Sequence, residues 1–414
     1  MKSEEQVHNN NDSKNGPSLK DPIPFDLTVE ILTRLPVKSL LKFQYVSKTW
    51  CSIIRSKDFI NSSVYMRSTP PTSRLLISFK NGQLTRKNAE KRLFFFTSSQ
   101  EQDHESSSLV ANLETTMASM DAYFHPRCAS VNGFICLSHK GRFMVCNPST
   151  RQVITLPEIA GNDMKSAYKY LGYDPVNDQY KAMCKIASSS EEDQEHVVLT
   201  LGCDKKPSWR HIEGVNKSYH PLTKGICING FVYYGAITPT QYKKNDRVIV
   251  CFDVRSERQR FINLPSTDNI HWDSTSTLID YKGNLANVNI VRSRGETSFN
   301  FDFWVLRDAK EHEWSMRSFS FRRCWWDYLG ETSILSFQGT NKMGEIILAP
   351  KFLPRSVRPF NILYFNVESN IFKEVKVEGV ADDEEFRRRY GIGNNDNCHL
   401  YISPEEHGAN FTFL

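Results

Sequence analysis

Apolar residues recur at helical spacing in the first part of the chain, between residues 23 and 59. Leu27, Ile31 and Leu35 follow one another every four residues, which places them on one face of a helix. Asp26 stands just before this run, where a carboxylate can accept the free backbone N–H groups of a first turn. The pattern predicts a short amphipathic helix with Asp26 as its N-cap.

Two further helices are predicted after Pro36, because proline ends one helix and can begin the next. The third helix has a single apolar stripe made of Val46, Trp50, Ile53 and Ile54. Three such helices in roughly 35 residues bury too little apolar surface to offset the entropy lost on ordering them. We therefore expect their excess apolar surface to contact another protein.

Beyond residue 65 the helical period fades, and short strand-like runs separated by Gly, Asn, Asp and Pro replace it. In a recurring pattern, an apolar run is followed by Asp or Asn, a few turn residues, and an aromatic or basic strand. Clear copies have their turn residue at Asn147, Asp253, Asp308 and Asn366, and weaker copies have it at Asp174 and Asp204. Asp and Asn open tight turns because their side chains bond the following backbone, so the pattern predicts hairpins in an all-β region.

Glycine turns precede four of the predicted strands. They are Asn132-Gly133, Asn229-Gly230, Lys282-Gly283 and Met343-Gly344. Their spacing indicates a repeat of about 50–60 residues, which is typical of kelch-like propeller blades. Four-stranded units of this kind bury their faces by stacking radially on one another. The sequence therefore predicts an α+β multidomain protein, in which three N-terminal helices precede an all-β propeller of about six to eight blades.

Composition excludes several classes of function. The chain has 414 residues, 39% of them hydrophobic, and 52 basic residues nearly balance 47 acidic ones. This surface does not favour nucleic-acid binding. No stretch of about 18 residues is apolar throughout, and residues 1–20 are polar, so we expect neither a membrane span nor a secretory signal. The expected location is the cytoplasm, the nucleus or both.

Residues with the spacing of a catalytic or metal site were not found. The ten cysteines are widely separated, and no Cys-x-x-Cys pair occurs, which disfavours a structural zinc site and favours buried free thiols. Gly-x-Ser-x-Gly, His-Glu-x-x-His and phosphate-loop motifs are also absent. We expect no catalytic residue, no metal and no cofactor, and hence a protein that is not an enzyme.

The run Leu-Thr-Arg-Leu-Pro-Val-Lys-Ser-Leu-Leu-Lys-Phe at 32–43, followed by Trp50, resembles the plant form of the F-box. Ile23 stands where that motif usually has leucine. The Asn-Gly-x-(apolar)-Cys and Phe-Asp…Leu-Pro phrases within 125–380 resemble the F-box-associated domain of a large plant family. The resemblance implies three parts: a disordered segment at 1–20, an F-box at 21–65 and an F-box-associated propeller at 70–414.

The F-box resemblance also implies a partner, namely a Skp-family adaptor and, through it, a cullin. The residues that it assigns to the adaptor-binding face are Pro24, Leu27, Ile31, Leu32, Leu35, Pro36, Leu40, Leu41, Val46 and Trp50. The function it implies is substrate recognition in a Skp–cullin–F-box ubiquitin ligase. The propeller would then bind an unknown protein target.

Two aromatic-rich segments, around His271 and at 322–328, are candidates for target binding, because Trp, Tyr and Arg dominate interface hot spots. The residues concerned are Trp272, Trp325, Trp326 and Tyr328. The alternative is that these side chains fill the space between blades. Two other functions also stay open: a propeller scaffold that docks the adaptor without ubiquitin transfer, and a propeller lectin or enzyme with a helical cap.

Overall fold

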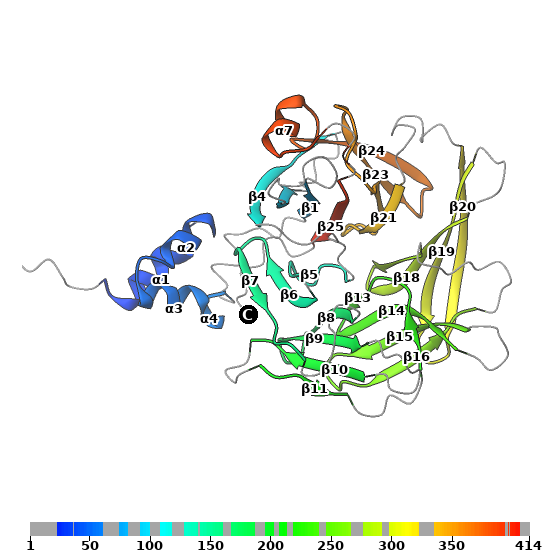
Figure 1. Ribbon diagram of the computed structural model, residues 1–414, viewed down its shortest axis with the longest axis horizontal. Helices are drawn as coiled ribbons and strands as arrows, with labels where there is room; N and C mark the ends of the chain where they lie inside the picture. The colour runs from blue at the N-terminus through cyan, green and yellow to red at the C-terminus, as the bar shows by residue number, and fades with distance from the viewer. Residues whose placement is uncertain are drawn as a thin grey trace, which may run out of the picture. The chain divides into compact units, whose positions relative to one another are not determined.

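The computed structural model divides the chain into two compact units, Met1–Thr69 and Pro70–Leu414 (Figure 1). The residues that it describes are 23–35, 37–60, 74–81, 92–99, 108–117, 128–139, 141–159, 167–186, 195–202, 207–212, 218–239, 246–265, 276–291, 298–322, 335–393, 396 and 398–405. No helix in this part of the chain is long and apolar enough to cross a membrane.

The first unit contains the predicted helices, and a short fourth helix follows them. They are α1 (Phe25–Thr33), α2 (Val37–Phe43), α3 (Lys48–Arg55) and α4 (Lys57–Ile60). The prediction that Asp26 caps the first helix is wrong, because Pro24 occupies the N-cap position and no side chain caps the helix. Asp26 instead lies in the first turn, where its charge opposes the positive end of the helix dipole. Ser47 caps α3, and its Oγ accepts a hydrogen bond from the Trp50 backbone N–H at 3.1 Å.

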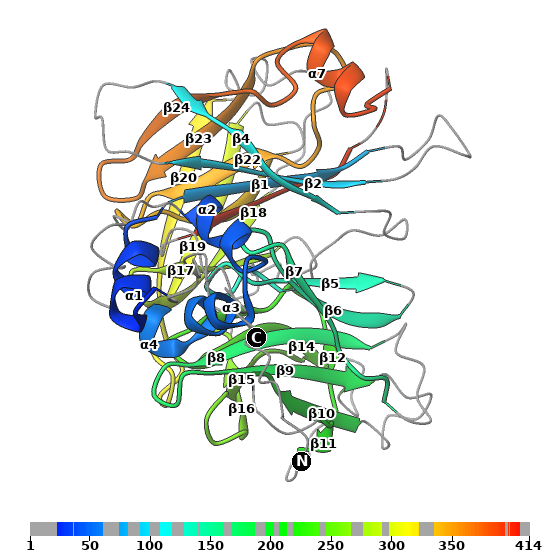
Figure 2. The ribbon, with the colours of Figure 1, turned by 90° about the vertical axis from the view of Figure 1, so that its left-hand side faces the viewer.

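Within the described part of the second unit, the strands form six sheets that are the blades of a propeller. Blade 1 contains β25 (Leu400–Glu405), β1 (Arg74–Lys80), β2 (Leu93–Ser99) and β4 (Asn112–Met117). Blade 2 contains β5 (Ile135–His139), β6 (Arg142–Asn147) and β7 (Gln152–Thr155), and blade 3 contains β8 (Tyr168–Asp174), β9 (Gln179–Ile186), β10 (Glu195–Thr200) and β11 (Arg210–His211). Figure 2 shows the third blade with its strands in this order.

The other three blades follow along the chain. Blade 4 contains β12 (His220–Pro221), β13 (Ile226–Ile228), β14 (Phe231–Thr238), β15 (Asp246–Asp253) and β16 (Gln259–Asn263). Blade 5 contains β17 (Thr277–Tyr281), β18 (Asn284–Val291), β19 (Ser298–Asp308) and β20 (Glu313–Arg322). Blade 6 contains β21 (Leu335–Thr340), β22 (Ile346–Pro350), β23 (Phe360–Asn366), β24 (Ile371–Glu378) and β3 (Ser108–Val110), and the helix α7 (Glu384–Arg389) follows it. Both the predicted fold class and the blade count, at the lower end of its range, are confirmed.

Strands from the two ends of the propeller sequence close the ring. The C-terminal strand β25 is the inner strand of blade 1, where Ile402 pairs with Ile77 of β1. In Figure 1 the red β25 lies between β1 and β21. Near the N-terminal end of the propeller sequence, β3 leaves the first blade and joins blade 6 as a parallel partner of β24, with Leu109 opposite Val377. Backbone hydrogen bonds therefore connect the first and last blades twice.

The predicted turns occur in two families. The inner hairpin turns at Asn132-Gly133, Asn229-Gly230 and Lys282-Gly283 have positive φ at both residues, between 47° and 87°, as type I′ turns require. In the outer hairpins, the side-chain oxygens of Asn147, Asp253, Asp308 and Asn366 accept backbone N–H groups two and three residues further on. The proposed copy at Asp204 lies outside the described residues.

The buried apolar residues of the described propeller form five cores, and each core is shared by neighbouring blades. In the largest core, the Tyr170 ring of blade 3 stacks on the Tyr234 ring of blade 4 at 4.2 Å between centroids. Gly172 has no room for a side chain there, because a Cβ would lie 2.5 Å from Val254 of blade 4. Packing between blades thus supplies the hydrophobic stabilisation that a single sheet lacks.

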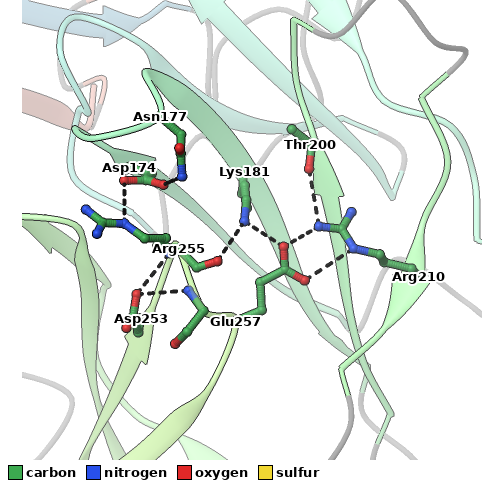
Figure 3. A network of polar contacts seen from close by, with 9 residues as sticks. Asp174, Asn177, Lys181, Thr200, Arg210, Asp253, Arg255 and Glu257 are labelled. Carbon is green, nitrogen blue, oxygen red and sulfur yellow. Dashed lines mark hydrogen bonds and ion pairs between the residues drawn. The ribbon is translucent and has the colours of Figure 1, made fainter.

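A charged network also joins blades 3 and 4 (Figure 3). The carboxylate of Glu257 accepts a hydrogen bond from Lys181 Nζ at 2.6 Å and one from Arg210 Nε at 3.2 Å. The Lys181 side chain is only 7% exposed, so its ammonium depends on Glu257 for a counter-charge. Beside this pair, Arg255 Nε donates to the buried carboxylate of Asp174 at 3.4 Å.

The Glu257→Gln variant should lower the free energy of unfolding by about 2–4 kcal/mol, because the nearly buried Lys181 then loses its negative partner. Chemical denaturation of the full chain measures the change. The matched control is Glu158→Gln, which removes a glutamate that pairs with Arg142 in an exposed position and should change stability little. Equal effects of the two variants would contradict a stabilising role for the network between blades 3 and 4.

Candidate binding surfaces of the helical unit and the propeller

The helical unit exposes apolar side chains that a globular unit normally buries. Leu27 and Ile31 lie one turn apart on α1 and are 51% and 42% exposed, and Val46, after α2, is 61% exposed. Pro24, at the start of α1, is also exposed. Apolar side chains gathered in this way favour a protein-binding surface.

The structure divides the predicted adaptor-binding residues by exposure. Leu32 and Leu40 are buried, with 0% and 3% exposure, so they hold the helices together. Leu35, Leu41 and Trp50 are half-buried, and the Trp50 ring packs on Phe43 at 5.0 Å between centroids. Pro36 lies outside the described residues. The assignment of these residues to adaptor binding stays a prediction.

The sequence pattern missed two exposed apolar residues of the same unit. Phe25 is 64% exposed at the start of α1, and Tyr45 is 92% exposed after α2. Both lie off the stripe of apolar residues spaced four apart. The spacing gave no signal of their exposure, because Leu27 and Ile31 on the stripe are exposed as well.

The Leu32→Ala variant should destabilise the helical unit by about 2–4 kcal/mol, because it leaves a cavity at a fully buried position. Hydrogen exchange of the α1–α3 amides in the full chain should become correspondingly faster. Leu27→Ala is the matched control, and it should leave exchange unchanged because Leu27 is half exposed. Faster exchange in both variants would show that Leu27 is part of the core.

The inner strands of all six blades enclose a cavity of about 300 Å³ at the centre of the propeller. Its lining includes one polar or aromatic residue from each blade: Ser403, Asn132, Tyr173, Asn229, Asp280 and Thr340. The inner hairpin turns at Asn132-Gly133 and Asn229-Gly230 also line it, so the cavity lies at the end of the propeller where these turns gather.

The polar groups of the cavity mainly hold the turns in place. Asp280 Oδ1 accepts a hydrogen bond from the Gly283 N–H at 2.7 Å, and Asn229 Nδ2 donates to Gly283 O at 3.1 Å. Burial, then the hydrogen bond to Asp178, raises the pKa of Tyr173, so its hydroxyl stays protonated. Among the described residues, no three His, Cys, Asp or Glu side chains are placed to hold a metal ion. The cavity is therefore a candidate binding site whose polar lining also shapes the turns.

The aromatic candidates for target binding lie outside the described residues. Trp272 belongs to the segment 266–275, which joins β16 of blade 4 to β17 of blade 5. Trp325, Trp326 and Tyr328 belong to 323–334, which joins β20 of blade 5 to β21 of blade 6. Each segment thus connects the outer strand of one blade to the inner strand of the next. Their role in target binding stays a prediction.

Comparison with known protein families separates the same two units. A family model described as the F-box domain matches residues 22–62, and one described as the F-box associated beta propeller domain matches residues 74–406. The chain belongs to the F-box proteins with an F-box-associated propeller. The resemblance seen in the motif at 32–43 is thereby confirmed. Because the matching propeller model is the F-box-associated one, the kelch-like description of the repeat stays a prediction.

Curated relatives of this F-box protein come from Arabidopsis thaliana. F-box protein At1g30790 is 49% identical, over 95% of this chain and 98% of its own length. Putative F-box protein At1g32660 is 42% identical, over 93% of this chain and 82% of its own length. F-box protein DOR is 33% identical, over 87% and 89% of the two chains. The similarity therefore extends over both the F-box and the propeller.

Proposed function

We propose that this F-box protein is the substrate-recognition subunit of a Skp–cullin–F-box ubiquitin ligase. The F-box would dock a Skp-family adaptor and, through it, a cullin, and the propeller would hold a protein target. The protein would catalyse nothing itself. Its contribution would be proximity, because holding a target beside the ubiquitin-conjugating enzyme raises the local concentration of the target's lysines.

One observation carries the adaptor part of this proposal: α1 exposes Leu27 and Ile31 on one face. Without a partner, these two side chains stay in contact with water. Covering a large aliphatic side chain contributes about 1.5–3 kcal/mol. Val46 adds a third such side chain after α2. An adaptor with a complementary apolar groove would bury these residues.

The target part of the proposal is supported by the architecture of the propeller. Turns and connections from all six blades surround a rigid centre, and such loops are the usual sites of binding on a fixed scaffold. The aromatic segments 266–275 and 323–334 connect consecutive pairs of blades. We propose that Trp272 and Trp325, with Trp326 and Tyr328, contribute to target binding.

A double variant with Leu27→Ser and Ile31→Ser should reduce co-purification of a Skp-family adaptor at least tenfold, because two exposed apolar contacts are lost. The melting temperature should stay unchanged, since neither side chain is buried. Val176→Ser is the control: Val176 is 67% exposed in a propeller turn, and its replacement should leave adaptor binding intact.

The same preparation separates the alternative functions. A cullin that co-purifies with the wild type, and is lost in the double variant, supports the ligase assignment. Adaptor binding without the cullin would favour the scaffold. Full retention of the adaptor by the double variant would contradict the assignment of α1 to the docking face.

A further inference from the structure

Blade 2 differs from the other blades in its number of strands. In the described part of the propeller it contains three, β5, β6 and β7, whereas each of the other five sheets contains four or five. Its outer strand is therefore β7 (Figure 1). Within the described residues, no strand pairs with the side of β7 that faces away from β6. Another extended segment can add to an edge of this kind.

The open edge of β7 presents backbone groups at every second residue. Leu156 N donates to Phe143 O of β6 at 2.8 Å, so Leu156 continues the β6–β7 pair as a hydrogen-bonded position. Such positions alternate in an antiparallel pair. Ile154 therefore also bonds β6, whereas the N–H and C=O groups of Val153 and Thr155 point away from it. These groups have the spacing that an added strand requires.

A contact from blade 3 closes one end of this edge. Two residues beyond Thr155, Pro157 O accepts a hydrogen bond from Trp209 Nε1 of the neighbouring blade at 2.7 Å. Pro157 also has no N–H group to offer to an added strand. The available groups therefore end at Thr155, and an added segment would pair along β7 itself.

The outer strands of the other blades are protected against such pairing. Charged residues occur in β4, β16 and β20, for example Glu114, Arg260 and Arg317. The outer strands β11 and β3 have only two and three residues. Charge and short length are common means of protecting a sheet edge. The sequence of β7 is Gln-Val-Ile-Thr, which has no charge, so among the described outer strands β7 alone lacks both kinds of protection.

A groove of about 600 Å³ lies beside this edge, between blades 1 and 2. One wall consists of residues of β4, and the other includes Cys146 and Val153. Cys146 Sγ lies 3.3 Å from Met117 Sδ of β4, so the side of blade 2 that carries Cys146 faces blade 1. Val153 pairs with Cys146 and thus lies on the same side. Leu113 and Val153 are 41% and 40% exposed, so apolar surface of the groove is accessible.

The edge and the groove together define what kind of partner fits. In a strand that pairs with β7, the residues opposite Val153 and Thr155 point to the side of the groove, and the residue between them points to the opposite side. The exposed Leu113 and Val153 favour apolar side chains at both positions. Arg151 also lines the groove, is exposed and forms no ion pair among the described residues, so it favours an acidic residue nearby.

We propose that the open edge of β7 binds an extended segment of the target protein, which adds to blade 2 as a fourth strand. Two apolar side chains of the segment, separated by one residue, would fill the groove beside β4, and an acidic residue would lie near Arg151. Main-chain hydrogen bonds would supply affinity, and the groove would supply selectivity. The inference rests on the proposed function only for the source of the segment, because the edge and the groove belong to this chain alone.

Random twelve-residue peptides displayed on phage, selected on the full chain, supply the probe. The selected peptides should contain two apolar residues separated by one residue, with an acidic residue close by. One such peptide is then synthesised with a fluorescent label, and its affinity is measured by anisotropy. Methyl groups placed on successive backbone nitrogens of the peptide should weaken binding at least tenfold at every second position, because only alternate N–H groups face β7.

The Thr155→Pro variant should weaken peptide binding at least tenfold, because it removes an N–H group that faces away from β6. Its melting temperature should change little, since proline is tolerated on an edge strand where its missing N–H faces solvent. The matched control is Thr155→Val, which keeps the N–H group and should bind like the wild type. If the proline variant fails to fold, Leu113→Ser decides the question, because Leu113 lies in the groove but outside β7 and its loss should weaken binding about tenfold.

Three results would overturn the proposal: no selected peptide, equal affinity of the wild type, Thr155→Pro and Leu113→Ser, or an effect of methylation without the two-residue period. A wild type that sediments as a dimer, with Thr155→Pro as a monomer, would assign the edge to a second copy of this chain instead. Peptide binding is measured without adaptor or cullin. A chain that binds the peptides but co-purifies no cullin would therefore refute the ligase assignment alone, and the opposite result would refute the role of β7 alone.

Discussion

The exchange of strands between the first and last blades is the constraint on which the propeller depends. A ring of sheets can open at the joint where the propeller sequence begins and ends, and here backbone pairing closes that joint twice. Strand β25 completes blade 1 from the C-terminal side, and β3 adds to blade 6 from the N-terminal side. The ends of the propeller sequence are therefore held by hydrogen bonds as well as by side-chain packing, and this closure fixes the inner strands around one centre.

That centre contains a cavity to which all six blades contribute residues. At the end where the type I′ turns gather, polar side chains line the cavity, and those around Gly283 form hydrogen bonds that shape the turns. Backbone N–H groups of Ala129 and Ser130, which line this cavity, donate to Gly225 O and to the Tyr401 hydroxyl oxygen, so blades 4 and 1 hold this part of the lining.

The F-box differs from the propeller in how much of its apolar surface it buries. Its helices are too short to bury all of their apolar residues, so the same periodic pattern supplies both a small core and an exposed face. Leu32 belongs to the core, whereas Leu27 and Ile31 on the same helix are accessible. The protein thus combines an F-box that exposes apolar side chains with a propeller whose described apolar residues form five cores shared between blades, and family models match both parts.

Features that depend on neighbouring residues could be predicted from the sequence alone. The turn residues Asn147, Asp253 and Gly230 act through bonds and φ angles within a few residues, so the hairpins, the repeat and the propeller class could be predicted from them. The F-box was recognisable for a similar reason, since the run at 32–43 and the nearby Trp50 lie close together in the sequence.

Properties that depend on neighbours far away in the sequence were decided only by the tertiary structure. The exposure of Leu27 and the burial of Leu32 differ although both fit the helical pattern, because burial depends on what packs against each face. Closure of the ring needs residues near 109 to meet residues near 377. Burial and strand pairing of this kind depend on contacts between distant parts of the chain, which a linear pattern of residue types does not contain.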